Sequence, residues 1–485
     1  MAIDAVAART NIVLMIVDDL GWQDTALGLH ELRPPFQGSY RTPHLLRLAE
    51  EGLVFTDAHA SAPVCTPSRV SLITGQSPAR HGVTYWVRDA DRDTSAGHPH
   101  LRPPAWNVNG LQPGAVTLPA LLAEVGYRTI HVGKAHWGAV GTPGADPMAL
   151  GFEVNVAGHG LGAPGSYLGV DGFGNLREDG PSPWSVPGLE PWHGEQVWLT
   201  DVLAQRADGE LRAAHAAGEP FFLYLAPYAV HTPITANPEL VEHYADLPPV
   251  EAAYASMIEG VDNMLGRVLA TLDELDLAGE TLFVFTSDNG GLSAHGRAGE
   301  PHVHNAPLRS GKGSAYEGGT RVPLVVRWPG HVEPGRRTTQ TAVLHDLFPT
   351  LLTAARAEIP AEHLAQMDGV DLTATCIDAD RDPQPRTILW HQPHFWGVNG
   401  PGIEPYSALR VGDEKLIWFH DGGRLELYDV AADPGESNEL CATRPERVAA
   451  LVAVLVERLR AVDAGLSIDK ATGEAVPFPA VDDER

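Results

Sequence analysis

Two short carboxylate motifs directly follow apolar segments of the chain. Asp18 and Asp19 come after one such segment, and Asp288 and Asn289 come after another. Because ligands of parallel α/β sheets bind at the carboxyl ends of the strands, these side chains are expected at one edge of a sheet. Carboxylate and amide oxygens suit a hard divalent cation, Ca²⁺ or Mg²⁺, and disfavour zinc and copper. Each motif alone is also an ordinary turn former, so the predicted metal site depends on both motifs ending core strands.

Basic and titratable side chains follow other apolar segments. Lys134 and His136 lie together in GKAHWG, His231 lies in AVHTP, and Lys312 lies in GKGSAYEGG. Taken singly, each is most simply a surface lysine or a loop histidine. Gathered at the same sheet edge as the carboxylates, they would bind a tetrahedral anion and transfer protons around it.

A single cysteine stands in the turn-prone segment SAPVCTPSRVSLITG, where a helix is expected to begin. Arg69 follows Cys65 one position too early for a cysteine-based phosphatase loop. A thiol protease would use one histidine partner and no metal. A thiolate is also a soft ligand, which fits poorly beside a hard cation. As a thiol, Cys65 is therefore difficult to reconcile with the predicted oxygen ligands.

The composition limits the classes of partner. The chain has 485 residues, 44% of them hydrophobic, and a formal net charge of -28. An excess of negative charge repels phosphate backbones, so nonspecific binding to nucleic acid or to an anionic membrane is not expected. Cysteines at positions 65, 376 and 441 are too few and too scattered for a disulfide framework. Cys376 and Cys441 could pair with each other, but in a reducing compartment we predict two free buried thiols.

The N-terminus has no recognisable targeting segment. The apolar run Ile12–Val17 is short, follows Asp4 and Arg9, and ends in two aspartates rather than in a small-residue cleavage site. No other run approaches the ~20 apolar residues of a membrane span. The sequence predicts a cytoplasmic protein without membrane contact, or a periplasmic or secreted one if an export segment has been removed.

Short apolar runs rich in β-branched and aromatic residues predict buried strands. Helical patterns lie between them, the clearest at 251–277, where apolar residues recur every three or four positions. This alternation predicts an α/β fold with a large, mostly parallel sheet flanked by helices. The expected strands are Asn11–Val17, Arg128–Gly133, Phe221–Ala226, Thr281–Ser287 and Pro323–Trp328, and further helices are expected at 42–52 and 117–127.

The pattern changes after residue 370. Apolar and polar residues alternate around the turn Asp421-Gly422-Gly423, which predicts a β-hairpin, and an amphipathic helix follows at 444–462. We therefore predict a catalytic α/β domain at 1–370 and a smaller C-terminal α+β subdomain with an antiparallel sheet at 371–485. The segments 89–114 and 138–191 are expected to be long loops, which are often functional.

One motif resembles a known family. Cys65, Pro67 and Arg69 match the Cys-x-Pro-x-Arg signature of the type I, formylglycine-dependent sulfatases of the alkaline phosphatase superfamily. The resemblance is dense over residues 10–330 and sparser to 440. It implies a sulfuric ester hydrolase, arylsulfatase-like. Segments similar to the same family are DDLG after the first strand, RTPHLLRLAEEGLVFTDAHA, GKAHWG, SDNGG, KGSAYEGGTRVP and LYDVAADPGESNEL.

The resemblance implies that Cys65 is oxidised to Cα-formylglycine by a formylglycine-generating enzyme. The hydrated aldehyde would be an oxygen nucleophile that attacks the sulfur of a sulfate ester. Arg69 and Lys134 would hold this hydrate. The implied metal, usually Ca²⁺ in the family with Mg²⁺ as the alternative, would be bound by Asp18, Asp19, Asp288, Asn289 and the formylglycine at position 65.

Proton-transfer roles also follow from the resemblance. Lys134, His231 and Lys312 would neutralise the sulfate oxygens, together with the metal. His231 or Lys312 would protonate the departing alkoxide or phenoxide. His136 would then take a proton from the second hydroxyl of the hydrate, so that sulfate is expelled and the aldehyde is regenerated.

Two other functions remain open. A phosphonate monoester or phosphodiester hydrolase of the same superfamily can also use formylglycine, although Asn289 in place of a further carboxylate, and His136 after Lys134, favour a sulfatase. A catalytically idle binding protein with an unmodified Cys65 has less support, because every position that maps to the family holds the expected residue type.

The sequence leaves the substrate open among aryl, sugar and small alkyl sulfates, and it does not indicate an oligomeric state. The acidic balance weighs against a long polysulfated polymer and for a small monosulfate ester. Aromatic and histidine side chains in the predicted loops are candidates for the pocket wall, where they could stack on a ring. They are His98, His100, Trp106, Trp137, His304, His394 and Trp396.

Overall fold

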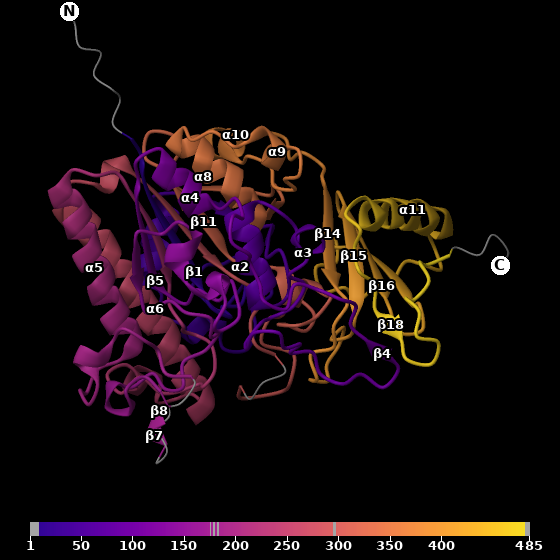
Figure 1. Cartoon of the computed structure of the whole chain (residues 1–485), viewed down its shortest axis with the longest axis horizontal. Helices are drawn as coiled ribbons and strands as arrows, with labels where there is room; N and C mark the ends of the chain where they lie inside the picture. The colour runs from indigo at the N-terminus through magenta and orange to yellow at the C-terminus, as the bar shows by residue number, and fades with distance from the viewer. Residues whose placement is uncertain (1–8, 175, 178–179, 182–183, 294–296, 481–485) are drawn as a thin grey trace, which may run out of the picture.

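The computed structural model describes residues 9–480 except 175, 178–179, 182–183 and 294–296. Its main element is an eight-stranded sheet with helices on both faces (Figure 1). Along the sheet the strands are β12 (Arg336–Thr338), β2 (Leu53–Phe55), β11 (Leu324–Arg327), β10 (Thr281–Ser287), β1 (Asn11–Val17), β9 (Phe221–Ala226), β5 (Arg128–Gly133) and β6 (Val154–Val156).

The predicted α/β fold is confirmed. β1 lies between β10 and β9 and is parallel to both. β5 continues the parallel arrangement between β9 and β6. β11 runs antiparallel to its neighbours β10 and β2, which makes the sheet mixed but mostly parallel. The short strands β2, β6 and β12 were not expected, because each has only three residues and a run that short carries little periodicity.

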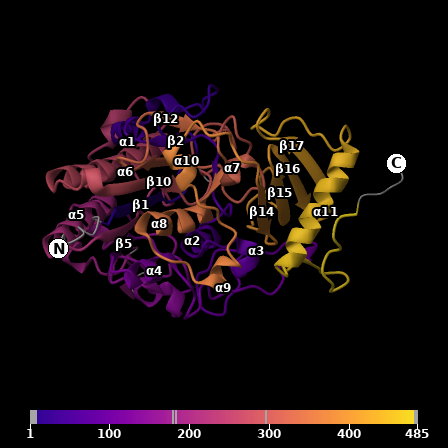
Figure 2. The ribbon, with the colours of Figure 1, turned by 90° about the horizontal axis from the view of Figure 1, so that it is seen from above.

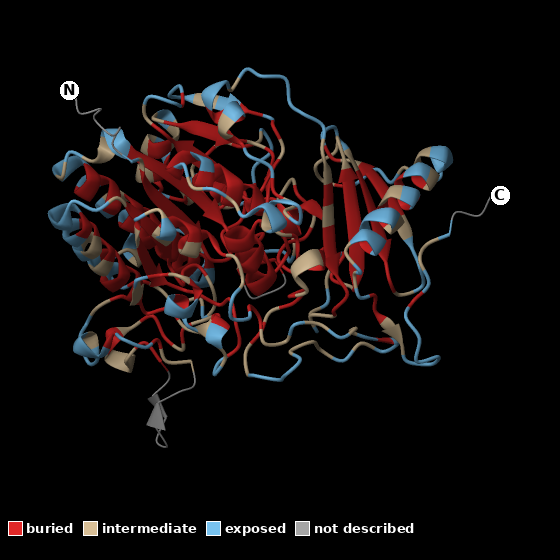
Figure 3. Ribbon diagram, turned by 45° about the horizontal axis from the view of Figure 1, so that its top comes forward, coloured by how far each residue is buried: buried red, intermediate tan, exposed pale blue. Residues whose placement is uncertain are grey.

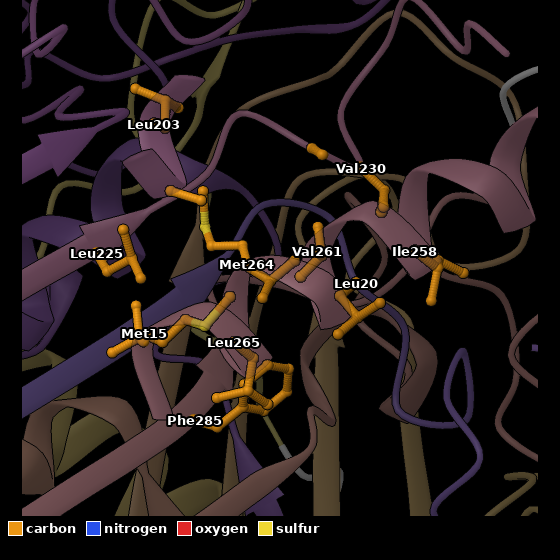
Figure 4. Packing of buried hydrophobic residues seen from close by; sticks show 14 of the residues in the cluster. Met15, Leu20, Leu203, Leu225, Val230, Ile258, Val261, Met264, Leu265 and Phe285 are labelled. Atoms are coloured by element: carbon orange, nitrogen blue, oxygen red, sulfur yellow. The ribbon is translucent and has the colours of Figure 1, made fainter. Parts of the chain in front are cut away.

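Residues of β1 alternate between two hydrophobic cores, as the period of a strand requires. Met15 packs with Leu225 and Phe285 of the neighbouring strands and with Leu265 of α6 (Figure 4). Residues on the opposite face, such as Leu14, belong to the second core. Figure 3 shows the sheet strands as buried and the outer helix surfaces as exposed. The helices around the sheet are α1 (Pro43–Glu50), α2 (Cys65–Thr74), α4 (Leu118–Glu124), α5 (Leu199–Ala217), α6 (Pro249–Glu274) and α8 (Leu347–Ala355).

A second sheet lies at the C-terminal end of the molecule, and helix α11 (Pro445–Ala461) packs along it (Figure 2). The turn between its last two strands contains Asp421-Gly422-Gly423, so the predicted hairpin is confirmed. The boundary at residue 370 stays a prediction. The sheet is antiparallel and consists of β14 (Thr387–Gln392), β15 (Tyr406–Val411), β16 (Glu414–Phe419) and β17 (Leu425–Asp429).

Buried ion pairs join this sheet to the main one. Arg410 of β15 donates hydrogen bonds to both carboxylate oxygens of Asp57, at 3.0 and 2.8 Å. Arg410 also lies 3.0 Å from Nε2 of His59. Asp57, His59 and Glu317 are close enough to share a cation, but Arg410 and Arg321 already supply positive charge to them. This cluster therefore has a structural explanation.

Two further predictions can be compared with the structure. Cys65, Cys376 and Cys441 are all free. Cys376 is buried, as expected, whereas Cys441 is only partly buried, which corrects the prediction for that residue; Cys65 is buried as well. None of the described helices combines the length and the apolar character that a bilayer crossing requires.

Candidate active site

The two carboxylate motifs meet at the carboxyl ends of β1 and β10. The backbone N–H of Asp19 donates to Oδ1 of Asp288 at 3.2 Å. The amide nitrogen of Asn289 donates to Oδ1 of Asp19 at 2.8 Å. Oxygens of Asp18, Asp19 and Asp288 all lie within 4.8 Å of one another, and all three side chains are buried. The parallel pairing of β1 with β10 creates this arrangement, because it ends both strands at the same level.

The segment after β9 places His231 beside the same carboxylates. Asp18 and this segment exchange two backbone hydrogen bonds, from Asp18 N–H to the Ala229 carbonyl and from Val230 N–H to the Asp18 carbonyl. Nε2 of His231 consequently lies 3.7 Å from Oδ2 of Asp19. Nδ1 of His231 donates to the Thr232 carbonyl at 2.8 Å, so the Nε2 atom faces the site.

Two buried lysines balance the first two carboxylates. Nζ of Lys134, just past β5, lies 2.7 Å from Oδ2 of Asp18. Nζ of Lys312 lies 2.6 Å from Oδ1 of Asp19. Burial opposes the charged form of Lys312, but Asp19 outweighs it and raises the pKa of the ammonium. Lys312 therefore carries a positive charge throughout the physiological range.

Cys65 is the first residue of α2, and every residue of this helix is buried. One turn later, Arg69 donates through Nε to Oδ2 of Asp288 at 2.7 Å and through Nη1 to the Lys134 carbonyl at 2.9 Å. Burial alone would raise the pKa of Asp288, but Arg69 and Lys134 outweigh it, and the pKa is lowered. In this structure the guanidinium thus supports the carboxylate and the Lys134 loop.

His136 is held as a neutral base. Nε2 donates to the Val87 carbonyl at 2.8 Å. Burial, with a smaller effect from Lys134, lowers the pKa of His136 well below its ordinary value. The buried Nδ1 atom finds no hydrogen-bond partner within the described part of the chain. A Cβ at Gly162 would stand 2.6 Å from this Nδ1, so only glycine leaves room for the ring. The lone pair on Nδ1 is therefore available to accept a proton.

The oxygen set fits a hard divalent cation. Oδ1 of Asp18 and Oδ1 of Asn289 are buried without a hydrogen-bond partner among the described residues. Burial raises the pKa of Asp18 well above its ordinary value, although Lys134 acts in the opposite direction. A bound cation would supply the missing partner for these oxygens and stabilise the charged carboxylate.

A cavity of about 180 Å³ opens above these residues. Its floor holds Cys65, Asp19, His136, His231 and Lys312, so the structure brings together residues that the sequence places on separate segments. Lys134, Arg69 and Asp288 lie beneath this floor and are fully buried. The remaining lining residues are Val64, Trp86, Val87, Arg88, Gly162, Ala163, Trp184, Thr232, Leu292 and Trp396.

Of the aromatic and histidine residues expected in the wall, only Trp396 lines this cavity. Trp137 is instead a core residue whose indole N–H donates to the Arg69 carbonyl. His394 stacks on Tyr85 behind the wall, with ring centres 4.7 Å apart. The other positions also fall elsewhere: Trp106 packs against His394, His304 bonds to the Ala298 carbonyl, and His98 and His100 lie beside Asp421.

Three aromatic or charged wall residues, Trp86, Arg88 and Trp184, were missed. Trp184 lies within the predicted loop at 138–191, whereas Trp86 and Arg88 stand just before the predicted loop at 89–114, in a stretch with no motif of its own. Only the aromatic and basic pair separated by Val87 was available as a signal. Such a pair is too common in sequences to indicate a binding site. Its place beside the site follows only from the hydrogen bond between His136 and the Val87 carbonyl, which the sequence does not reveal.

Comparison with known proteins decides the family. The model of the family described as Sulfatase matches residues 10–357, well over half of the chain. The chain belongs to the sulfatase family. A second model, N-sulphoglucosamine sulphohydrolase, C-terminal, matches residues 311–464 of this sulfatase. The resemblance stated from the motifs is therefore confirmed.

Full-length relatives agree. This sulfatase is 30% identical to a sulfatase of Formosa agariphila, over 98% of this chain and 93% of the relative. It is 31% identical to N-acetylgalactosamine-6-sulfatase of Rattus norvegicus, over 90% of this chain and 82% of the relative. The crystal structure of Ps i-CgsB in complex with k-i-k-neocarrahexaose has a TM-score of 0.73 at 26% identity, covering 93% of both chains. The protein is thus an enzyme, a sulfuric ester hydrolase.

Proposed function

We propose that this sulfatase hydrolyses a sulfate monoester of a sugar or an aryl alcohol by means of a formylglycine formed from Cys65 and a divalent cation, most simply Ca²⁺. One observation carries the proposal: Cys65 opens onto a cavity whose floor also holds Asp19, His136, His231 and Lys312. These carboxylate, histidine and lysine side chains fit catalysis by an oxygen nucleophile beside a cation better than catalysis by a thiol.

Two groups that are not part of the encoded chain complete the proposed site. A formylglycine hydrate at position 65 would supply an oxygen nucleophile and a second hydroxyl. A cation would be held by Asp18, Asp19, Asp288 and Asn289, with the formylglycine as a further ligand, and would supply positive charge near the sulfate oxygens.

The chain's own cations bind the rest of the anion. Lys312 reaches the cavity and remains charged. Lys134 lies beneath the floor, 2.7 Å from Asp18, and offsets the negative charge of the carboxylates. Arg69 fixes Asp288 and the Lys134 carbonyl. A sulfate ester therefore enters a site in which positive charge is fixed before the substrate arrives, and little reorganisation is needed in the transition state.

Two protons must move. The first goes to the departing oxygen as its bond to sulfur breaks. Nζ of Lys312 lines the cavity and carries a proton, whereas Nε2 of His231 can deliver one only after the ring has been protonated, because burial lowers the pKa of His231 to about 3. The second leaves the remaining hydroxyl at position 65 when sulfate is expelled, and Nδ1 of His136 accepts it. That atom is unpartnered and the ring is neutral, as a base requires.

The substrate class is proposed from the relatives together with the cavity. The rat relative is named as an N-acetylgalactosamine-6-sulfatase, and one solved neighbour is a complex with k-i-k-neocarrahexaose. We therefore place sugar sulfates ahead of alkyl sulfates for this enzyme. A formylglycine-generating enzyme is the implied maturation partner. The cytoplasmic location stays a prediction.

The test uses full-length enzyme produced together with a formylglycine-generating enzyme. Peptide mass spectrometry over residues 62–69 should find the aldehyde, and kcat/KM for 4-nitrophenyl sulfate should exceed that for a 4-nitrophenyl phosphonate monoester. Cys65→Ala should abolish turnover. A clear preference for the phosphonate would overturn the proposal in favour of the phosphonate hydrolase, and turnover by the unmodified thiol form would overturn the formylglycine.

A further inference from the structure

The wall of the cavity above the reacting groups has a composition of its own. Trp86 and Trp396 line it, and Arg88 is the one arginine among the described lining residues. Trp184 lines it as well, and the remaining wall is small or aliphatic, including Ala163 and Leu292. Flat aromatic faces with a single hydrogen-bond donor suit a ring that has an apolar face and hydroxyls at its edge.

Trp396 comes from the C-terminal part of the chain, directly after β14, yet it packs against the loop of Lys312. Nζ of Lys312 lies 6.0 Å from the centre of the Trp396 ring. A Cβ at Gly313 would lie 2.3 Å from an atom of this ring, and φ at Gly313 is +84°. Glycine is therefore required here, because it lets the indole lie directly on the backbone next to Lys312.

The two tryptophan segments are fixed to each other. His394 contacts Oγ1 of Thr84 through Nε2 and Oγ of Ser95 through Nδ1, both at 2.8 Å. The backbone N–H of Ala96 donates to the Phe395 carbonyl at 2.9 Å. Because these bonds join the segments that carry Trp86 and Trp396, the aromatic wall exists before a ligand binds. A preformed wall saves the entropy of ordering it.

Arg88 stands at the opening with its charge already balanced. Its Nε donates to Oδ2 of Asp89 at 2.8 Å, and Nη2 lies 2.7 Å from the same oxygen. Arg92 approaches that oxygen too, at 3.4 Å. A neutralised guanidinium still has N–H groups to donate, but it offers little net attraction to a further acidic group. The formal net charge of -28 also works against such a group.

The size of the cavity limits what can enter. A volume of about 180 Å³ corresponds to roughly six water molecules at about 30 Å³ each. This space matches one ring and its sulfate, and any further ring of a longer ligand would lie outside the cavity.

We propose that this wall is a subsite for one terminal, neutral, singly sulfated sugar ring, which stacks on Trp396 and Trp86 and receives a hydrogen bond from Arg88. The inference rests on the proposed sulfatase reaction at Cys65 and names the substrate class of that site.

The test compares aldehyde-bearing full-length enzyme with Trp396→Ala and Arg88→Gln, using 4-nitrophenyl sulfate and a methyl glycoside of a monosulfated neutral hexose. Trp396→Ala should lower kcat/KM about tenfold on both esters, because both present a ring. Arg88→Gln should lower it about tenfold on the hexose alone, because the nitrophenyl ring has no hydroxyl to bind. Arg92→Gln and Trp192→Ala are the matched controls, because neither residue lines the cavity. Arg92 contacts the same carboxylate, Asp89, as Arg88 does. Neither control should change the rates.

Inhibition by inorganic sulfate provides a separate measurement, because sulfate occupies the floor and not the wall. Its Ki should be unchanged in both wall variants, which shows that they are folded. Three results would each overturn the inference. They are an equal loss of kcat/KM on both esters for Arg88→Gln, no loss of kcat/KM for Trp396→Ala, and equal turnover of an internally and a terminally sulfated trisaccharide. Failure of the proposed function looks different, since the wild type would then hydrolyse no sulfate ester.

Discussion

Nζ of Lys415 lies 2.9 Å from Oε1 of Glu317 and 3.0 Å from Oε1 of Glu436, with all three side chains buried. Lys415 belongs to β16, whereas Glu317 begins the short helix α7 (Glu317–Thr320), five residues after Lys312. The C-terminal sheet is thereby attached to the segment that carries a charged group of the active site. Glu436 adds a second link, since its Oε2 accepts the backbone N–H of Glu317 at 2.6 Å.

Lys415→Met should destabilise the protein by about 3–5 kcal/mol, because it leaves buried carboxylates without their counter-charge. Urea unfolding measures the change. Lys470→Met, at an exposed lysine, is the control and should cost far less. Adding Glu436→Gln to Lys415→Met should recover part of the loss, because the pKa of Glu436 is already raised to about 7, chiefly by burial. No recovery in the double variant would contradict this account.

Changing His391 should alter how stability depends on pH. Burial lowers the pKa of His391 to about 4, while the unfolded chain has the ordinary value of 6.5. Between these values the unfolded state binds more protons, so stability falls as the pH falls, by about 1.4 kcal/mol per pH unit for each such histidine. His391→Gln should remove that contribution from the pH dependence of the unfolding free energy. The effect should be seen between about pH 4.5 and 6.5, the range between the pKa values of the folded and unfolded states. His215→Gln, at an exposed histidine, should leave the slope unchanged.

Leaving-group dependence should identify the proton donor. Loss of the general acid matters most for a poor leaving group such as a sugar alkoxide and least for 4-nitrophenoxide. Whichever of His231→Gln and Lys312→Gln shows the larger excess loss of kcat on the sugar ester is the donor. The other should lose activity similarly on both esters, because it only stabilises charge. Equal ratios for both variants would show that neither side chain is the donor.

Cation binding can be measured without turnover. Ca²⁺ at 100 times its dissociation constant should stabilise the wild type by about 2.7 kcal/mol, and chelation should abolish activity. Asp288→Asn should lose most of this stabilisation, whereas Asp246→Asn, at an exposed aspartate, should keep it. Thermal unfolding with Ca²⁺ or Mg²⁺ ranks the two ions. An unfolding temperature that responds to neither ion would reject the cation site.

Much of the site was predictable because strand ends can be located from local patterns. The central strands are continuous apolar runs, and parallel pairing brings their ends together, so Asp18, Asp288 and Lys134 could be assigned to one place from the sequence alone. The motif resemblance then suggested the role that we propose for Cys65. The confirmed family and fold both follow from these local signals.

The wall could not be predicted in the same way, because it depends on contacts between distant segments. Trp137 and Trp396 look alike in sequence, yet Trp137 is enclosed by Phe152 and Tyr224 while Trp396 faces the cavity. The pairing of Arg410 with Asp57 joins residues 353 positions apart and has no local signature. Aromatic content alone therefore did not distinguish a core residue from a ligand-contacting one.

The burial of α2 sets an order of events during synthesis. Cys65 is 5% exposed, and no residue of its helix reaches the surface. A second protein that must bind several residues around the cysteine has no access to them once the helix is buried and the Lys312 loop and Trp396 have packed beside Cys65. The proposed oxidation of Cys65 therefore has to happen while the nascent chain is still unfolded. A chain that folds before it meets its maturation enzyme would be stable, well formed and permanently inactive.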